Sequence, residues 1–393
     1  MNPILRTVLG GLLAAALSLS SGVAPAQPAH TAQPATTPPS LATGGPASNA
    51  ELDAMARRVA SGHPEAMEGI LKRAEAGEAH AQLTAGLVLL RGKGVPRSEM
   101  QAVVWFRRAA EQGNLSAMHN LAVVLDRGPP GVIDRPEALK WYRAAAEKGY
   151  ARSQSNLAYL IVQEGGVERL PEARAWLEKA AAQDEPLAHY MLGTLLYEGR
   201  GVDKNEAEGA RLIQRGAQGG EREAQYRLAL ILGNGRGLER DEKSALQWLR
   251  RSAEQAYPEA QLLLGAMFMR GRPDLPRDTK AGITWLRRAA RQENAEAQYA
   301  LGLAYAEGRG VAQDMHEAVA WISAAAKNGH ERAIEDLARA RQSGRMAPQP
   351  ARPASPVLGP SPWSASPPRP RPAPIVPESD APAPIAPAQG GAN

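Results

Sequence analysis

Tryptophan recurs along this chain at an interval of about 36 residues. Six of the seven tryptophans keep the spacing, at positions 105, 141, 176, 248, 285 and 321, and Leu212 stands where one is missing. A repeat of this length indicates stacked supersecondary units that bury their apolar faces against one another. The 393 residues would by length alone suggest two or three compact domains, but the repeat predicts one continuous array.

Two series of small residues and one of turn glycines keep step with the tryptophans. The first small residue of each unit is Ala81, Ala117, Ser153, Ala188, Ala224, Ala260 or Ala297. The second follows five residues later, as Gly86, Ala122, Ala158, Gly193, Ala229, Gly265 or Gly302. A turn glycine comes six residues further on, at Gly92, Gly128, Gly199, Gly235, Gly271 and Gly308, with Glu164 as the exception. These series predict seven units.

Each unit is predicted to form two helices joined by a short turn. In the last unit, apolar and small residues share one face of a helix over 295–307, and Gly308 ends it because glycine tolerates the left-handed cap. The second helix carries Ala318 and Trp321 on its inner face. Small residues let the two helix backbones approach where they cross. We expect the tryptophan of the next helix to fill the space beside them.

The spacing of alanine, tyrosine, glycine and tryptophan closely resembles the Sel1-like repeat, a relative of the tetratricopeptide repeat. Two copies carry the resemblance best, at 186–220 and 295–329; the second contains Ala297, Tyr299, Leu301, Gly302, Gly308, Gly310, Val311, Ala318 and Trp321. The resemblance implies an all-α fold, a right-handed α-solenoid of about seven helix-turn-helix repeats over residues 79–330. A degenerate helical pair or cap is expected at 49–78, and a capping helix at 331–345.

The N-terminal residues have the pattern of a secretory signal. Arg6 precedes an apolar run of about 12 residues, and Ala24-Pro25-Ala26 supplies small residues for cleavage. The run is too short to cross a bilayer, which needs ~20 apolar residues. We therefore expect a signal peptide at 1–26, export to the periplasm, and no transmembrane span in the mature chain.

Two segments contain too few large apolar residues to offset the conformational entropy that they would lose on folding. Residues 27–48 contain proline, alanine, threonine, serine and glycine without a charge, and 15 of the 32 prolines lie in the last 48 residues. We expect a disordered linker at 27–48 and a disordered proline-rich tail at 346–393. The tail should favour extended polyproline II where proline is dense.

The sequence contains no catalytic, cofactor-binding or metal-binding motif. The absence of cysteine excludes thiolate metal sites and thiol nucleophiles. The glycines of 233–237 resemble a phosphate loop, but they follow a predicted helix instead of a strand and so fail the context of that motif. A net charge of +5 is too weak to indicate nucleic acid. We expect a protein that is not an enzyme. The alternative is that two carboxylates distant in the sequence come together in the fold and form a catalytic pair.

A partner-binding groove is the leading site hypothesis. The side of each first helix opposite its inner face resembles the concave wall of tetratricopeptide-like superhelices. Read across the units, it contributes tyrosines, a histidine and arginines, which can anchor and orient a peptide. The candidates are Arg91, His119, Arg127, Tyr159, Tyr190, Tyr197, Tyr226, Arg270 and Tyr299. The alternative is that several of these tyrosines pack between helices.

The resemblance implies a non-enzymatic scaffold or adaptor that binds a peptide or protein, in envelope signalling, export or morphogenesis. An alternative is a cell-wall spacer that holds peptidoglycan or exopolysaccharide. A cell-wall or β-lactam hydrolase is a third reading. The lack of cysteine and of a Ser-x-x-Lys motif stands against it.

Overall fold

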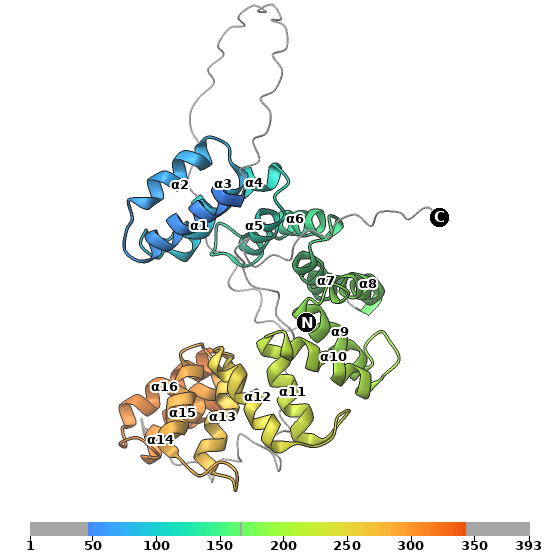
Figure 1. The fold of residues 1–393 in the computed structure, drawn as a ribbon. Helices are drawn as coiled ribbons and strands as arrows, with labels where there is room; N and C mark the ends of the chain where they lie inside the picture. The colour runs from blue at the N-terminus through green and yellow to red at the C-terminus, as the bar shows by residue number, and fades with distance from the viewer. Residues whose placement is uncertain (1–45, 166, 343–393) are drawn as a thin grey trace, which may run out of the picture. The chain divides into compact units, whose positions relative to one another are not determined.

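The computed structural model describes residues 46–165 and 167–342, and in this part the chain is helical from end to end (Figure 1). An antiparallel bridge between Arg272 and Leu275 lies in one turn. The predicted signal peptide at 1–26, most of the linker at 27–48 and the tail at 346–393 lie outside the described residues. None of the helices described is long and apolar enough to cross a membrane.

Seventeen α-helices and one short 3-10 helix make up the described part of the chain. The elements are α1 (Pro46–Ala60), α2 (Ala66–Glu75), α3 (Ala79–Arg91), α4 (Glu99–Glu111), α5 (Leu115–Arg127), α6 (Arg135–Glu147), α7 (Ala151–Gly165), η2 (Val167–Arg169), α8 (Leu170–Ala181), α9 (Pro186–Glu198), α10 (Glu206–Gln218), α11 (Arg222–Asn234), α12 (Glu242–Glu254), α13 (Pro258–Arg270), α14 (Thr279–Ala290), α15 (Ala295–Glu307), α16 (Met315–Lys327) and α17 (Glu331–Gln342).

The helices pack in chain order, each against the one before and the one after. Pairs α3–α4 to α15–α16 form seven units, numbered 1 to 7 below; α1 and α2 precede them and α17 follows. In each unit the odd-numbered helix is called the first helix and the even-numbered helix the second helix. The all-helical solenoid predicted from the repeat is confirmed.

Local signals in the sequence set the helix ends. The second helix of a unit usually begins at a side chain that accepts a hydrogen bond from a backbone N–H of the first turn, as Asp241 does from Ser244 at 2.9 Å. Four first helices end at a glycine in the left-handed conformation, with φ between 63° and 71°; they are Gly92, Gly199, Gly235 and Gly308. Both devices satisfy backbone groups that a helix end leaves open.

The turn after each second helix also needs a positive φ. Units 1, 2, 4 and 7 supply glycine there, at Gly113, Gly149, Gly220 and Gly329. Units 3, 5 and 6 place Asp184, Ala256 and Glu293 in the same conformation, with φ of 57°, 59° and 62°. A left-handed residue with a Cβ costs ~1–2 kcal/mol, so these three turns carry backbone strain that the other four avoid.

Ala256→Gly is therefore expected to stabilise the protein, although the gain is only part of the strain because glycine loses ~0.5–1 kcal/mol more backbone entropy on folding. We expect the free energy of unfolding to rise by about 0.5 kcal/mol in urea titrations followed by circular dichroism. The reverse change, Gly149→Ala, introduces a Cβ that meets nothing within 4 Å, so it tests the backbone alone. The same strain and entropy terms apply with opposite sign, so it should cost about 0.5 kcal/mol. A loss of stability on Ala256→Gly would contradict this account.

The small residues in the middle of the first helices are required by close helix crossings. A Cβ on Gly86 would come within 2.5 Å of Phe106, and one on Gly302 within 2.6 Å of Ile322. The expectation that tryptophan fills this space is wrong, because the residue after the tryptophan occupies it. The tryptophans themselves are half-buried on the second helices.

A buried glutamine joins three helices at five of the seven units. Gln225 of α11, for example, donates to the carbonyl of Ala217 at the end of α10 at 3.2 Å, and accepts from Gln255 at the end of α12 at 2.8 Å. The same two bonds recur at Gln82, Gln154, Gln261 and Gln298. We call this arrangement the glutamine clasp. Units 2 and 4 have Met118 and His189 at the clasp position.

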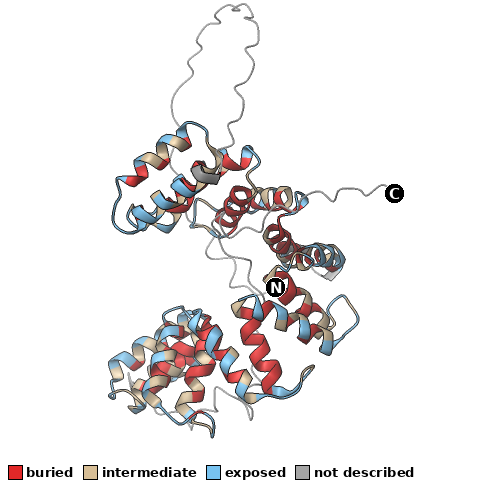
Figure 2. Ribbon diagram, viewed as in Figure 1, coloured by how far each residue is buried: buried red, intermediate tan, exposed pale blue. Residues whose placement is uncertain are grey.

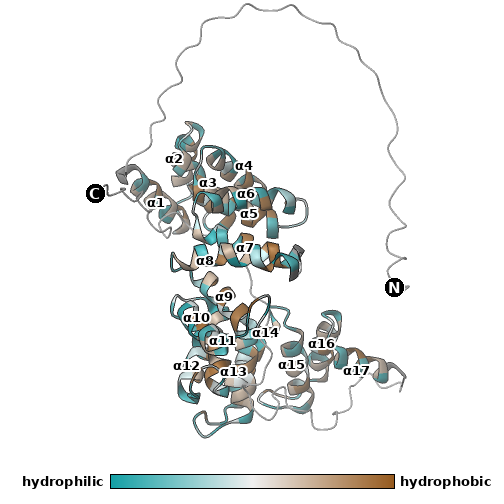
Figure 3. Ribbon diagram, turned by 90° about the vertical axis from the view of Figure 1, so that its right-hand side faces the viewer, coloured by the Kyte–Doolittle hydropathy of each residue, from teal (hydrophilic) through white to brown (hydrophobic). Residues whose placement is uncertain are grey.

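The first helices form the interior of the array. α11 is red along most of its length in Figure 2, and every residue from Glu223 to Gly233 is buried. Figure 3 shows the contrast in hydropathy between α13, which is largely apolar, and α12, which has a polar outer side. Because a first helix also contacts a neighbouring first helix, as α9 contacts α7 and α11, little of its surface remains for a ligand.

Candidate binding site

Four of the nine predicted groove residues are buried. His119, Tyr190, Tyr226 and Tyr299 are at most 5% exposed. Their side chains pack between helices in this structure and do not line an open wall. The physical reason is the contact between successive first helices, which covers the face that sequence periodicity leaves toward solvent.

Specific contacts hold these buried rings. The Nδ1 atom of His119 lies 3.1 Å from the hydroxyl of Ser153. The rings of Tyr226 and Tyr257 are 5.4 Å apart. Tyr299 stacks on His330 with ring centroids 4.2 Å apart and donates its hydroxyl to Asp336 of α17 at 2.8 Å. Tyr299 therefore attaches the final helix to the array.

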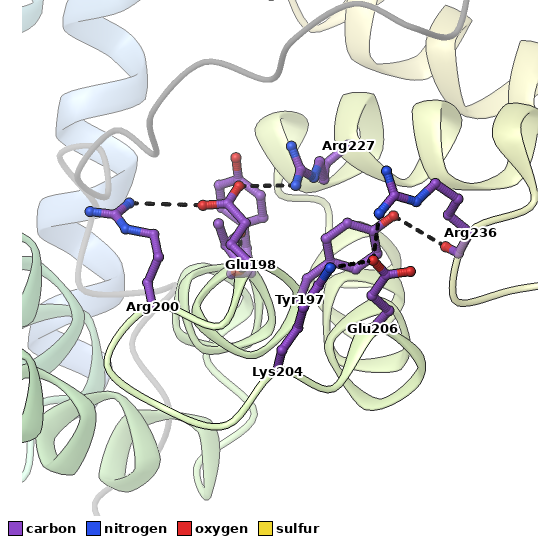
Figure 4. A network of polar contacts seen from close by, with 9 residues as sticks. Tyr197, Glu198, Arg200, Lys204, Glu206, Arg227 and Arg236 are labelled. Carbon is purple, nitrogen blue, oxygen red and sulfur yellow. Dashed lines mark hydrogen bonds and ion pairs between the residues drawn. The ribbon is translucent and has the colours of Figure 1, made fainter.

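The other five predicted residues reach the surface. Arg91, Arg127 and Arg270 are exposed at the ends of α3, α5 and α13, and Tyr159 and Tyr197 are half-buried. They come from five different units. Tyr197 is the one that lies in a larger group of charged side chains (Figure 4).

We call this group the cationic tyrosine cluster. It lies between units 4 and 5 and consists of Tyr197, Glu198, Arg200, Lys204, Glu206, Arg227 and Arg236. The end of α9, the turn after it and the start of α10 supply five of these residues, and α11 and the turn after α11 supply the other two. Two consecutive repeats thus build the cluster.

Arg227 is the buried cation of the cluster. Its side chain is only 8% exposed, donates to Glu198 at 3.0 Å and lies 5.0 Å from the centre of the Tyr197 ring. The hydroxyl of Tyr197 donates to the backbone carbonyl of Arg236 at 3.3 Å. These contacts from two sides fix the orientation of the tyrosine ring.

The remaining cations of the cluster face solvent. The side chains of Arg200, Lys204 and Arg236 are 46%, 52% and 62% exposed. Lys204 and Arg236 both contact Glu206, at 2.7 and 2.5 Å, and hydrogen bonds from these two hold the pKa of its carboxyl below the usual range. Burial raises the pKa of Tyr197, which keeps its hydroxyl neutral and able to donate. The seven residues of the cluster contain four cations and two carboxylates, and Asp203 in the same turn leaves a local excess of one positive charge.

The helical periodicity of the sequence identified Tyr197 as a candidate but not the charged residues around it. Arg227 stands one position beyond Tyr226, at an offset that the predicted groove face did not include. Its equivalents in the other units are Thr84, Asn120, Asn156, Met191, Leu263 and Ala300. Arg227 is thus the one charged residue at this position of the seven units, and an alignment of the units with one another would have identified it.

The described residues contain no group of three or more side chains placed to hold a metal ion. The geometry of the cluster suits recognition of an anion, because three exposed cations surround a tyrosine ring of fixed orientation. Flexible exposed cations around a fixed aromatic ring can pair with carboxylates while the ring contacts an apolar side chain.

A comparison with models of protein families agrees with the seven helical units of the structure. The family model of the Sel1 repeat matches seven consecutive segments, residues 79–114, 115–150, 151–185, 186–221, 222–257, 258–294 and 295–330. No curated protein matches the chain.

Among solved structures, the chain is similar to a Sel1 repeat protein from Oxalobacter formigenes, with 27% identity and a TM-score of 0.50, over 75% of this chain and 87% of that one. It is also similar to c5321, a protective antigen of uropathogenic Escherichia coli strains that displays an SLR fold, with 29% identity and a TM-score of 0.47. That match covers 75% of this chain and 65% of the length of c5321. The seven matched repeats cover more than half of the sequence, and the chain belongs to the Sel1 repeat family.

Proposed function

We propose that this chain is a non-enzymatic periplasmic scaffold that binds an acidic segment of a partner protein at the cationic tyrosine cluster. Sel1 solenoids are typical of protein–protein interaction scaffolds, which supports the class of function. The observation that carries the site is the accessible excess of positive charge around a fixed, half-buried tyrosine. The apolar run and small-residue site in residues 1–26 support the periplasmic location.

Each part of the cluster has a role in this proposal. Arg200, Lys204 and Arg236 are exposed enough to exchange water or intramolecular partners for carboxylates of the bound segment. Guanidinium groups suit this exchange, since they can hold a carboxylate with two parallel hydrogen bonds. Tyr197 offers a flat apolar surface for a neighbouring side chain. Arg227 is too buried to bind the segment and instead positions Tyr197 and Glu198.

A binding titration tests the site. The probe is a fluorescein-labelled peptide of alternating glutamate and leucine, and the comparison probe replaces its glutamates by lysines. We expect anisotropy to show binding of the acidic probe alone, and weaker binding as salt screens the charges. The double variant Lys204→Gln with Arg236→Gln should bind the acidic probe at least tenfold more weakly, as expected for charge-assisted bonds worth ~1.5–3 kcal/mol each.

The matched control removes two other exposed cations, Lys243 and Arg250 of α12, by the same change to glutamine. It lowers the net charge equally and leaves the cluster intact, so its affinity should equal that of the wild type. Equal weakening in both double variants would mean that binding follows net charge and would overturn the site. Cell fractionation tests the location separately: the chain should be released with periplasmic contents, and retention in the cytoplasm would contradict export.

A further inference from the structure

The tryptophans of the second helices differ in what covers their rings. Four of them have the cation three residues later in the chain over the ring, at 4.2 to 4.8 Å from the ring centre; the pairs are Trp105–Arg108, Trp176–Lys179, Trp248–Arg251 and Trp285–Arg288. Units 2 and 7 have Ala144 and Ala324 at the position of the cation. Trp141 and Trp321 therefore lack the intrahelical cation that caps the ring elsewhere.

Trp141 also lies in a hollow with acidic groups. A pocket of about 490 Å³ is lined by Asp134, Pro136, Glu137, Lys140, Trp141 and Ala144. The indole N–H of Trp141 donates to Glu137 at 3.1 Å, and Arg107 of α4 holds the same carboxylate. Asp134 is exposed and caps α6 by accepting from the backbone N–H of Glu137 at 3.0 Å. Glu137 is paired with Arg107 and Lys140 lines the same pocket, so the exposed Asp134 is the group left to pair with an arginine. The half-buried indole ring beside it can contact proline or an arginine side chain.

The chain contains such a segment outside the described residues. Residues 367–372 read Pro-Pro-Arg-Pro-Arg-Pro. We propose that this segment docks on Trp141 of the same molecule, with an arginine over the indole ring in the place of the missing cation. The prolines would contact Pro136 and Ala144, and the second arginine would pair with Asp134.

The tether favours this occupant over a separate partner. The 24 residues at 343–366 precede the segment and reach up to ~74 Å if extended at ~3.1 Å per residue. A tether long enough to span two sites makes binding intramolecular and raises the effective concentration of the segment. A single cation–π contact with a few proline contacts is weak between separate molecules, so the tether makes the difference between negligible and substantial occupancy.

Because the chain has no cysteine, two introduced cysteines can carry a dye pair on the full chain. We would place them at Glu147, exposed at the end of α6, and at Ser364, three residues before the segment. Docking predicts high energy transfer. Ala144→Arg rebuilds the intrahelical cap over Trp141 and should lower the transfer efficiency at least threefold. Replacing Arg369 and Arg371 by glutamine should do the same.

The matched control is Ala324→Arg, which adds the same side chain beside Trp321 in unit 7 and should leave the transfer unchanged. Equal transfer in the wild type and in Ala144→Arg would overturn the proposal, as would an equal loss in both alanine variants. Transfer that disappears on adding excess unlabelled chain would show docking between molecules and would overturn docking within one. Unchanged circular dichroism would show that each variant remains folded.

Discussion

Gly209→Ala is expected to lower the free energy of unfolding by about 3 kcal/mol through the addition of a single methyl group. A Cβ at this position of α10 would lie 2.5 Å from the backbone nitrogen of Tyr197 and 2.6 Å from the carbonyl oxygen of Gly193. These are backbone atoms, so α9 and α10 would have to separate. Overpacking typically costs ~1–3 kcal/mol and occasionally more. Because the new methyl group meets backbone atoms that cannot move separately, we expect a cost of about 4 kcal/mol, of which alanine regains ~1 kcal/mol through its helix propensity.

Urea titration of the variant gives the size of this effect, and Gly69→Ala is the matched control. A Cβ on Gly69 would meet the flexible end of Met55 at 3.1 Å, which can move. We expect that control to be neutral or slightly stabilising. The Gly209 variant should also bind the acidic peptide more weakly, because the displaced backbone belongs to Tyr197. Equal stability of the two alanine variants would show that close helix contact does not require glycine here.

Gln225→Leu should cost about 2 kcal/mol. The change removes the clasp that joins α10, α11 and α12, and it leaves the buried carbonyl of Ala217 without the side-chain donor described above. That carbonyl keeps the bond from the backbone N–H of Gly220 at 3.1 Å, so the cost is that of two lost side-chain hydrogen bonds, each worth ~0.5–1.5 kcal/mol. The leucine has a similar volume, so the loss is one of hydrogen bonding more than of packing.

Gln247→Leu on the exposed side of α12 is the control for the second prediction and should shift the urea midpoint little. Amide hydrogen exchange offers a second reading, since loss of the clasp should increase exchange at the end of α10 and the start of α11. If Gln225→Leu left both the midpoint and the exchange unchanged, the clasp would contribute nothing to the joint between units 4 and 5.

The sequence was sufficient to predict the repeat, because a glycine or alanine at a helix crossing and a glycine at a turn are required by backbone geometry. Gly193, Gly302 and Gly308 show that requirement directly. The identity of the filling side chain was not predictable from spacing. Tryptophan is the conspicuous residue of each unit, yet Phe106 and Ile322, one position later, are the ones that fill the crossing.

The site was predicted less well, because periodicity within one helix does not report contacts between helices 35 residues apart. It left open whether Tyr190 and Tyr226 line a groove or pack between helices, and the structure buries both. It also missed Arg227, whose partner Glu198 belongs to the preceding unit. The same limit concealed the glutamine clasp, in which donors and acceptors are separated by about 30 positions.

The polar links between consecutive units are not all alike. At the joint between α8 and α9 the glutamine clasp is replaced by His189, which contacts Asp184, and Asp184 in turn pairs with Arg215 of α10. At the joint between α4 and α5 the clasp position holds Met118, whose thioether cannot supply these bonds. We expect this joint to bend before the others under load. The cationic tyrosine cluster lies in later units, so such bending would change where the site points relative to α1–α4 without distorting the site itself.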